Sequence, residues 1–428
     1  MKTVGLITEY NPFHNGHLFH IERAKEVTGA DTVIVVMSGD YVQRGTPSMM
    51  PKALRAEMAL QCGASAVFEL PVCYATGSAE LFAMGAVSLL DSLNVVDAIC
   101  FGSESNDIKG LTALAALLHD EPPKYKELLQ AGIRKGLSFP AARHQAVADY
   151  ENGRDYSALL KDPNNILGIE YLKALKALNS TITPFSIQRE DSQYHDTALG
   201  GRFSSATAIR SLLAYSSSAL STYDGGESFS NTPLSNILTE LEDQVPPQCL
   251  ALLKDYHKVK YPIYQNDFSL LLKYKLLNKT PRDLIHYMDV SRDLANRICK
   301  QLNSFFNFKQ FCGLLKTKEI TYTRINRALL HIMLGTKKGN VFEYTENGYH
   351  FYARLLGFRK DREKLLSEIS KKSHIPLLTK LSANENLSAL GKRMLYHDTL
   401  SSNLYASVVT DKFKTAYENE YHQAIVKL

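Results

Sequence analysis

Two histidines, His14 and His17, are the residues whose type and spacing most directly suggest chemistry. They follow a short apolar run, Val4–Ile7, and a turn that contains Asn11 and Pro12, and the residues after them have helical apolar spacing. Two imidazoles three residues apart in the first turn of a helix lie on one side of it, beside the positive end of the helix dipole. This arrangement predicts a site that holds phosphate and neutralises charge developing on an attacked phosphorus atom.

A metal pair and a chance coincidence of surface residues are the alternatives for these histidines. Zinc proteases space two histidines four apart with a glutamate between them, and no third ligand is recognisable here, so we predict no protein-bound metal. The position of the pair directly after a strand favours phosphate. The His-x-Gly-His sequence of residues 14–17 also resembles the signature of the nucleotidyltransferase superfamily, which includes adenylyltransferases and class I aminoacyl-tRNA synthetases. The resemblance implies that both histidines and the helix N-terminus grip a nucleoside triphosphate.

A second segment, residues 204–210, combines hydroxyl groups with a cation. Ser204, Ser205 and Thr207 stand at an expected helix start, and Arg210 lies one turn further along, which suits the β and γ phosphates of a nucleotide. An ordinary capped helix is the alternative. The segment resembles the second superfamily motif. It has no Lys-Met-Ser-Lys-Ser sequence, so it fits the adenylyltransferase version better than the synthetase version.

Alternating strand and helix patterns must position these groups. They predict a doubly wound, Rossmann-like α/β sheet, whose ligands bind outside the carboxyl ends of its strands. The loop at 38–45 falls at that edge and is rich in groups that could face a ligand. The expected strands are 4–7, 31–37, 64–70, 97–101 and 183–189, and the expected helices are 16–27, 51–61, 78–93, 166–178 and one that opens at 204–210.

Four further residues lie near the same edge. Gly102 ends an expected strand, where a missing side chain admits an adenine or ribose, although a plain turn glycine is equally consistent. Asn164 and Asn165 would cap the following helix or present amides to a nucleotide. Arg189, at a strand end, is either a phosphate contact or a surface charge.

Length and composition limit the class of protein. The 428 residues have room for two or three domains, and 45% hydrophobic with 22% charged residues is usual for soluble globular proteins. There is no run of about eighteen apolar residues and no signal-peptide pattern, so we expect neither a membrane span nor export. The six cysteines form no Cys-x-x-Cys pair, which argues against a disulfide framework or zinc ribbon and favours a reducing cytoplasm.

Charge divides the chain in two. Residues 1–240 hold 19 Lys and Arg against 26 Asp and Glu, whereas residues 241–428 hold 30 against 18. The pattern predicts a catalytic domain over 1–215 with a helical insertion at 107–160, a Ser- and Gly-rich linker at 216–233, and a mostly helical basic domain over 234–428. A basic domain beside an acidic one suggests a polyanionic partner.

One segment of the basic half has the composition of a nucleic-acid contact. Several basic clusters occur there, and this one also carries hydroxyl groups and an aromatic ring that can stack on an unpaired base. A solvated helix face is the alternative for any single cluster. The residues expected to contact RNA are Lys316, Lys318, Tyr322, Arg324 and Arg327.

Taken together, these motifs resemble the bacterial tRNA(Met) cytidine acetate ligase family. The likeness rests on residues 9–18, 37–39, 43–45, 101–104, 163–168, 204–210 and 315–324, and it covers nearly the whole chain. It implies N4-acetylation of the wobble cytidine of elongator tRNA(Met): ATP and acetate form acetyl-adenylate, assisted by Mg²⁺, and the cytidine amine takes the acetyl group. The implied catalytic residues are His14 and His17. The implied ATP contacts are Ile7, Thr8, Glu9, Tyr10, Asn11, Pro12, Phe13, His14, Asn15, Gly16, His17, Leu18, Phe19, His20, Gly102, Asn164, Asn165, Arg189, Ser204, Ser205, Thr207 and Arg210.

Two other functions share parts of the pattern. A small-molecule adenylyl- or cytidylyltransferase, or an adenylate-forming ligase, would need the first half of the chain but not a large basic domain. A non-catalytic RNA-binding protein would keep the basic domain and lose one of the two histidines, and both are present. The sequence carries no signal for an oligomeric state.

Overall fold

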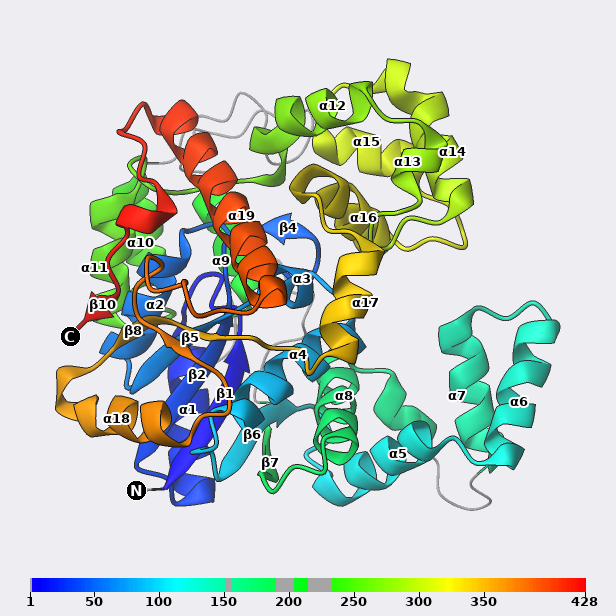
Figure 1. Cartoon of the computed structure of the whole chain (residues 1–428), viewed down its shortest axis with the longest axis horizontal. Helices are drawn as coiled ribbons and strands as arrows, with labels where there is room; N and C mark the ends of the chain where they lie inside the picture. Colours follow the sequence, from blue (N-terminus) through cyan, green and yellow to red (C-terminus); the bar gives the residue numbers. More distant parts are fainter. Residues whose placement is uncertain (1, 151–155, 190–203, 215–232) are drawn as a thin grey trace.

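The structure is a computed structural model, and it describes residues 2–150, 156–189, 204–214 and 233–428. Its centre is a mostly parallel sheet with the strand order β10-β8-β5-β2-β1-β6-β7, in which β9 pairs with β8 (Figure 1). The strands of this sheet are β1 (Thr3–Thr8), β2 (Thr32–Ser38), β5 (Ala66–Leu70), β6 (Ala98–Ser103), β7 (Thr183–Gln188), β8 (Ala353–Phe358), β9 (Leu377–Leu378) and β10 (Val426–Lys427).

The central strand β2 shows why the sheet is buried on both faces. It pairs in parallel with β1 on one side and β5 on the other. Ile34 and Val36 join the core on one face, whereas Val33 and Val35 join the core on the opposite face. A continuous apolar run is the pattern expected of such a strand, so the expected α/β class is confirmed.

Helices cover both faces of the sheet. One core packs under α4 (Ala79–Ser92), α5 (Ile108–Asp120) and α8 (Pro163–Ala177). The opposite core packs under α1 (Asn15–Thr28), α2 (Lys52–Gln61), α9 (Ala206–Ala214), α10 (Leu234–Leu241) and α11 (Pro247–Tyr256). Every helix and strand expected before residue 215 is present, with ends that shift by a few residues.

Two helical parts extend from this body. α6 (Pro123–Arg134) and α7 (Phe139–Tyr150) form a hairpin that stands away from the sheet (Figure 1). A helical lobe has its own core, to which the last long helix, α19 (Ala389–Phe413), contributes. The other helices of this lobe are α12 (Ser269–Leu277), α13 (Pro281–Leu284), α14 (Arg292–Gln301), α15 (Phe308–Leu315) and α16 (Tyr322–Leu334).

Beyond the lobe, the chain returns to the sheet. α17 (Lys338–Glu346) leads to β8, which pairs antiparallel with β5, and β10 follows α18 (Glu363–Lys372) and α19 and pairs with β8. The region after residue 234 is chiefly helical as expected, but these strands were not expected. The proposed domain boundaries stay a prediction, and the expected linker lies outside the described residues apart from Pro233.

A buried ion cluster joins this returning segment to the first part of the chain. Lys52 Nζ on α2 lies 2.8 Å from a Glu69 oxygen of β5 and 2.7 Å from a Glu420 oxygen. Arg354 on β8 pairs with both glutamates. All four side chains are nearly inaccessible to solvent, so early and late segments of the sequence share one interior.

In the described part of the chain, no helix has the length and apolar content needed to cross a membrane.

Candidate active site

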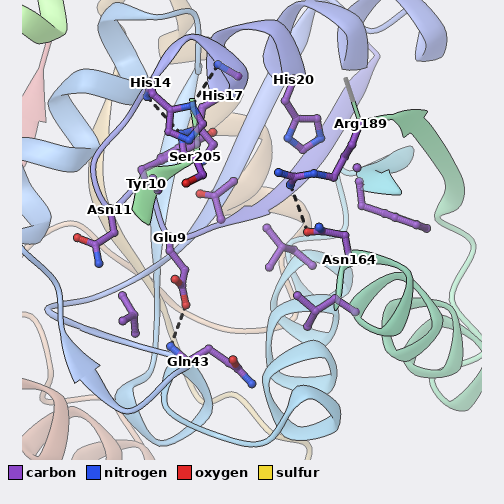
Figure 2. A pocket seen from close by; sticks show the side chains of 18 of the residues that line it. Glu9, Tyr10, Asn11, His14, His17, His20, Gln43, Asn164, Arg189 and Ser205 are labelled. Atoms are coloured by element: carbon purple, nitrogen blue, oxygen red, sulfur yellow. Dashed lines mark hydrogen bonds between the residues drawn. The ribbon is translucent and has the colours of Figure 1, made fainter. Parts of the chain in front are cut away.

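A cavity of about 290 Å³ opens at the carboxyl ends of β1, β6 and β7. Its walls come from the turn after β1, the first turns of α1, α8 and α9, and the ends of β6 and β7 (Figure 2). The two sequence motifs, at 14–17 and 204–210, therefore meet in one place, as expected for a sheet of this topology.

The turn after β1 is held in an unusual conformation. Tyr10 has a φ of 47°, in the left-handed region, and the Asn11–Pro12 peptide bond is cis. The side chain of Asn11 accepts a hydrogen bond from the backbone N–H of Met49 at 2.8 Å. A non-glycine residue in this region persists only where its surroundings fix it, which is common at ligand sites.

Arg55 fixes that turn from behind. Its guanidinium is fully buried and donates hydrogen bonds to the backbone carbonyl oxygens of Glu9, Ser38, Gly39 and Met50. Glu9 follows β1, Ser38 and Gly39 lie at the end of β2, and Met50 precedes α2. One side chain therefore ties the end of β1, which lines the cavity, to the neighbouring end of β2.

The two histidines of the motif are oriented by the helix they begin. His14 is the N-cap of α1: its Nδ1 accepts from Gly16 N–H at 3.1 Å, and Nδ1 of His17 accepts from His14 N–H at 3.3 Å. The rings lie 3.8 Å apart, centroid to centroid. A neutral imidazole whose Nδ1 accepts must carry its proton on Nε2, so both rings present an Nε2–H donor.

Both imidazoles are neutral near pH 7 in this structure. Burial, with Arg189 and Arg210 nearby, lowers the pKa of His14 to about 3. Burial and His14 lower the pKa of His17 well below its usual value. The histidines therefore act here as neutral hydrogen-bond donors, and the positive charge of the cavity wall resides on Arg44, Arg189 and Arg210.

The backbone amides of the first turn of α1 are already engaged. Asn15 N–H donates to the carbonyl oxygen of Gln244 at 2.9 Å, Gly16 N–H to His14 Nδ1, and His17 N–H to His14 O. The expectation that these amides face a phosphate is wrong for this conformation, because the histidines themselves cap the helix. Contact with an anion falls instead to the imidazole Nε2 atoms and the guanidinium groups.

Arg210 links the second motif to the first. Its guanidinium donates to the carbonyl oxygen of Asn11 at 2.7 Å and to the Thr207 hydroxyl at 3.0 Å. Ser205 caps α9 by accepting from Ala208 N–H at 3.0 Å. The helix-cap alternative is thus correct for Ser205, which nevertheless also lines the cavity.

The opposite wall carries the second arginine. Arg189, just after β7, donates to the side-chain oxygen of Asn164 at 3.3 Å (Figure 2). Asn164 also donates to the carboxylate of Glu104. Gly102 lies beneath: a Cβ added there would come within 3.2 Å of the Arg189 side chain. Its missing side chain keeps this wall open.

Asn165 has a structural position instead. It is 1% exposed, and its oxygen accepts from the Ser103 hydroxyl and from Glu104 N–H, which shapes the turn after β6. Of the predicted ATP contacts, five do not line the cavity: Pro12, Phe13, Asn15, Leu18 and Asn165. The others line it: Ile7, Thr8, Glu9, Tyr10, Asn11, His14, Gly16, His17, Phe19, His20, Gly102, Asn164, Arg189, Ser204, Ser205, Thr207 and Arg210.

Several lining residues were not singled out from the sequence. Gln43, Arg44 and Thr46 come from the hairpin of β3 (Tyr41–Val42) and β4 (Thr46–Pro47), and Gln43 N–H donates to the Glu9 carboxylate at 2.8 Å. The polar loop at 38–45 was the available signal for the first two. Phe82 and Tyr171 form an apolar wall, and their helical spacing is the same as that of core residues.

The residues expected to contact RNA lie on and before α16. Lys316, Lys318 and Arg324 are exposed, whereas Arg327 is held by Asp289 through two hydrogen bonds of 2.8 and 3.2 Å. Tyr322 is partly buried, with its hydroxyl directed to the Lys309 carbonyl oxygen at 3.4 Å. Exposed cations are thus available, while Arg327 is largely neutralised.

This segment adjoins the cavity. Gly45 has a φ of 77°, and a Cβ added there would come within 2.4 Å of the Arg327 backbone nitrogen. The hairpin that supplies Gln43 and Arg44 therefore packs directly on α16. A molecule bound along α16 would lie beside the hairpin wall of the cavity.

Comparison with known proteins gives matches along the full chain. The model of the HIGH Nucleotidyl Transferase family matches residues 1–421. The tRNA(Met) cytidine acetate ligase of Thermoanaerobacter sp. strain X514 is 40% identical over 407 residues, which cover 95% of each chain. The protein of the same name from Caldanaerobacter subterraneus subsp. tengcongensis is 38% identical over 435 residues and the full length of both.

Solved structures agree with these relatives. Apo TmcAL of Thermotoga maritima aligns over all of both chains with a TM-score of 0.89 and 31% identity. The same protein bound with alpha-thio ATP aligns with a TM-score of 0.87 and 30% identity.

Proposed function

Because the chain belongs to the tRNA(Met) cytidine acetate ligase family, we propose that it acetylates N4 of the wobble cytidine of elongator tRNA(Met), using acetate and ATP. The observation that carries this proposal is the cavity itself. The chain presents two neutral imidazole donors and the side chains of Arg44, Arg189 and Arg210 around a space lined by both nucleotide motifs. ATP binding is supported by the similar Thermotoga maritima protein, which was solved with an ATP analogue.

In the first step, an acetate oxygen attacks the α-phosphorus of ATP, acetyl-adenylate forms and pyrophosphate leaves. Negative charge increases on phosphate oxygens that His14 and His17 would meet through their Nε2–H groups. Arg189 and Arg210 would stabilise the departing pyrophosphate. Donors oriented before reaction stabilise such charge without reorganisation, and this is commonly the largest catalytic contribution.

In the second step, the cytidine N4 attacks the acetyl carbon, AMP leaves and the amine loses a proton. Cytidine N4 is a weak nucleophile because its lone pair is delocalised into the ring, so acetate must be activated first. The mixed anhydride is reactive enough that a covalent acyl-enzyme is unnecessary. Neither step uses acetyl-coenzyme A.

Mg²⁺ would reach the site on the nucleotide. Among the residues that the structure describes, no three His, Cys, Asp or Glu side chains gather closely enough to hold a metal ion. The cavity does carry one carboxylate, Glu9, beside the hydroxyl-bearing Thr8. A Mg²⁺ ion held chiefly by triphosphate oxygens fits this donor set and would aid the leaving group.

The tRNA would bind across the lobe that contains α16. Lys316, Lys318 and Arg324 are exposed there, and the hairpin packed on α16 leads directly to the cavity. A cytidine unstacked from the anticodon loop would enter the cavity from this side.

Mass spectrometry of tRNA nucleosides tests the proposal. The protein is incubated with ATP, isotopically labelled acetate and bulk tRNA, and we expect label in N4-acetylcytidine only when both ATP and acetate are present. Labelled acetyl-coenzyme A without ATP should leave the tRNA unlabelled. Efficient transfer from acetyl-coenzyme A, or no labelled cytidine under any condition, would overturn the proposal.

A further inference from the structure

The hairpin of α6 and α7 has a net positive charge, although the first half of the chain is acidic overall. Residues 123–150 hold five Lys and Arg against two Asp and Glu, whereas residues 1–240 as a whole hold 19 against 26. The excess is therefore local to this hairpin. It predicts that the hairpin meets an anionic partner.

The tip of the hairpin combines cations with exposed apolar side chains. Arg134 and Lys135 are exposed and, among the described residues, have no ion-pair partner. Beside them, Ile133 is 45%, Leu137 40% and Phe139 57% exposed. Large apolar groups gathered at a projecting turn, instead of scattered singly, indicate a contact surface.

The hairpin is a rigid support for this tip. Its helices approach closely at Gly132, where an added Cβ would come within 3.0 Å of the Ala142 side chain. Its base is anchored by Tyr125, Ala146 and Val147, which belong to the main core. A 12-residue helix is about 18 Å long, so the tip is held roughly that far from its anchor.

The hairpin also lies close to the cavity along the chain. η1 (Tyr156–Leu160) packs against both α7 and α8, and α8 begins with Asn164 in the cavity wall. In Figure 1 the tip points toward the same side of the molecule as the lobe of α13 and α14. One long polyanion on this side of the molecule can therefore contact both the tip and the lobe.

We propose that the α6–α7 tip is a second RNA-binding surface, in which Arg134 and Lys135 contact tRNA phosphates and Phe139 stacks on an unpaired base. The proposal rests on the proposed function, because it names how the same substrate is held. RNA fits better than a protein or a membrane, since the cations and the single aromatic ring occupy one small turn. Charge complementarity and base stacking both suit this composition.

The test uses the full chain with two changes at the tip, Arg134→Ala and Lys135→Ala. Affinity for bulk tRNA is measured by filter binding over a range of salt concentrations. The double variant should bind roughly tenfold more weakly near 0.15 M salt, and the slope of log affinity against log salt should fall by about two units. Acetate-dependent ATP–pyrophosphate exchange needs no tRNA, so it should equal that of the parent.

Phe139→Ala separates stacking from charge. It should weaken tRNA binding by about tenfold without changing the salt slope, and Phe139→Tyr should restore binding. A matched control removes two exposed cations elsewhere, Lys2→Ala near the N-terminus and Lys364→Ala on α18. Figure 1 shows the N-terminus and α18 on the opposite side of the body from the hairpin. This control should keep the affinity and slope of the parent.

The outcomes separate this proposal from the proposed function. Tip variants that bind and acetylate tRNA like the parent would overturn the second surface and leave acetylation intact. A parent protein that acetylates no tRNA would instead remove the proposed function. If light scattering showed a parent dimer that Phe139→Ala dissociates, with tRNA affinity unchanged, the tip would be a self-association surface and the proposal wrong.

Discussion

Neutral imidazoles define the chemistry of the site at the scale of single residues. Because Nδ1 of His14 and of His17 accepts a backbone hydrogen bond, each ring can only donate toward the cavity. A donor of this kind suits a phosphate oxygen that gains charge. It does not suit proton abstraction, and acetate, which is already an anion, needs no general base for the first step.

His17 is one of the two imidazole donors that line the cavity. His17→Ala should slow acetate-dependent ATP–pyrophosphate exchange by about a hundredfold or more, because one donor to the reacting phosphate is lost. Binding of tRNA should change little, since the basic lobe is untouched. Arg23→Ala is a suitable control, because Arg23 lies on the same helix and pairs with Glu26 at the surface. Near-normal exchange in His17→Ala would refute the role assigned to the pair.

The sequence was sufficient to predict which residues form the site, but not the protonation and tautomer of its histidines. His14, His17, Ser205 and Arg210 are brought together as their motifs suggest. The protonation and tautomer of the imidazoles could not be predicted, because they depend on burial and on a hydrogen bond of 3.1 Å that forms only when His14 caps the helix. Asn164 and Asn165 are adjacent residues of the same type, so the sequence does not distinguish them. Asn165 faces the interior because of the local path of the backbone.

At the scale of elements, Arg55 on α2 ties the end of β1, which lines the cavity, to the end of β2. Arg55→Met should destabilise the protein by at least about 3 kcal/mol, because several buried carbonyl oxygens lose their donor. Urea denaturation measures this. Glu57 lies two residues along the same helix and is only partly buried, so Glu57→Met should lower the free energy of unfolding much less. Equal losses in the two variants would show that Arg55 has no special role.

His350, between α17 and β8, should make stability depend on pH. It is 4% exposed, its Nε2 donates to the Gly85 carbonyl oxygen at 2.6 Å, and Tyr74 packs against its ring. Burial lowers the pKa of His350 to about 4. In the unfolded state His350 takes up a proton below about pH 6.5, whereas in the folded state it stays neutral until about pH 4. The free energy of unfolding is therefore highest above pH 6.5 and falls as the pH drops toward 4.

The expected loss from His350 is about 2 kcal/mol between pH 7 and pH 5. The variant His350→Gln keeps a donor for Gly85 but cannot titrate. Between pH 7 and pH 5, the unfolding free energy of the variant should therefore fall by about 2 kcal/mol less than that of the parent. Urea denaturation at both pH values gives the comparison. An identical pH dependence in parent and variant would contradict the assignment.

The segment before α16 supports a prediction on salt dependence. Lys316→Ala with Lys318→Ala should reduce the slope of log tRNA affinity against log salt by about two units, since both side chains are exposed. Arg327→Ala should have a smaller effect on the slope, because Asp289 already neutralises that side chain. A larger slope change for Arg327→Ala than for the lysine pair would show that Asp289 releases Arg327 to the RNA.

At the scale of the whole molecule, the ion cluster makes the two halves interdependent. Glu420 pairs with Lys52 and Arg354, and although burial opposes ionisation, these cations hold the pKa of Glu420 at about 2. Its contribution to stability is present at neutral pH and is lost as pH falls from about 4.5 toward 2. Removing one member leaves buried charge uncompensated.

Glu420→Gln should therefore destabilise the protein by about 3 to 5 kcal/mol, and parent and variant should each unfold in one transition. Glu418→Gln is a close control, because Glu418 pairs with Lys260 at the surface and should contribute at most about 1 kcal/mol. Calorimetry and urea denaturation check both values. Two separate transitions in the parent would show that the halves fold independently.

The shared sheet was also the least predictable feature of the fold. The strands of the first half alternate with helices at regular intervals, so their pattern was sufficient. β8 is a six-residue run between helical segments, with Gly357 inside it, and β10 has only two residues. The periodicity of a short apolar run does not distinguish a strand from a buried helix segment. The pairing of β8 with β5, and of β10 with β8, also depends on contacts between residues far apart in the sequence.

The same ion cluster has a consequence for how the protein is made. Lys52 is synthesised early, whereas Glu420 and β10, which follows it, are synthesised after the α6–α7 hairpin and the whole helical lobe. A nascent chain can form β1, β2 and β5 and pair Lys52 with Glu69 long before Arg354 and Glu420 complete the cluster. On the ribosome, the enzyme would therefore reach its stable interior only late in translation, and fragments released early would be substrates for proteases.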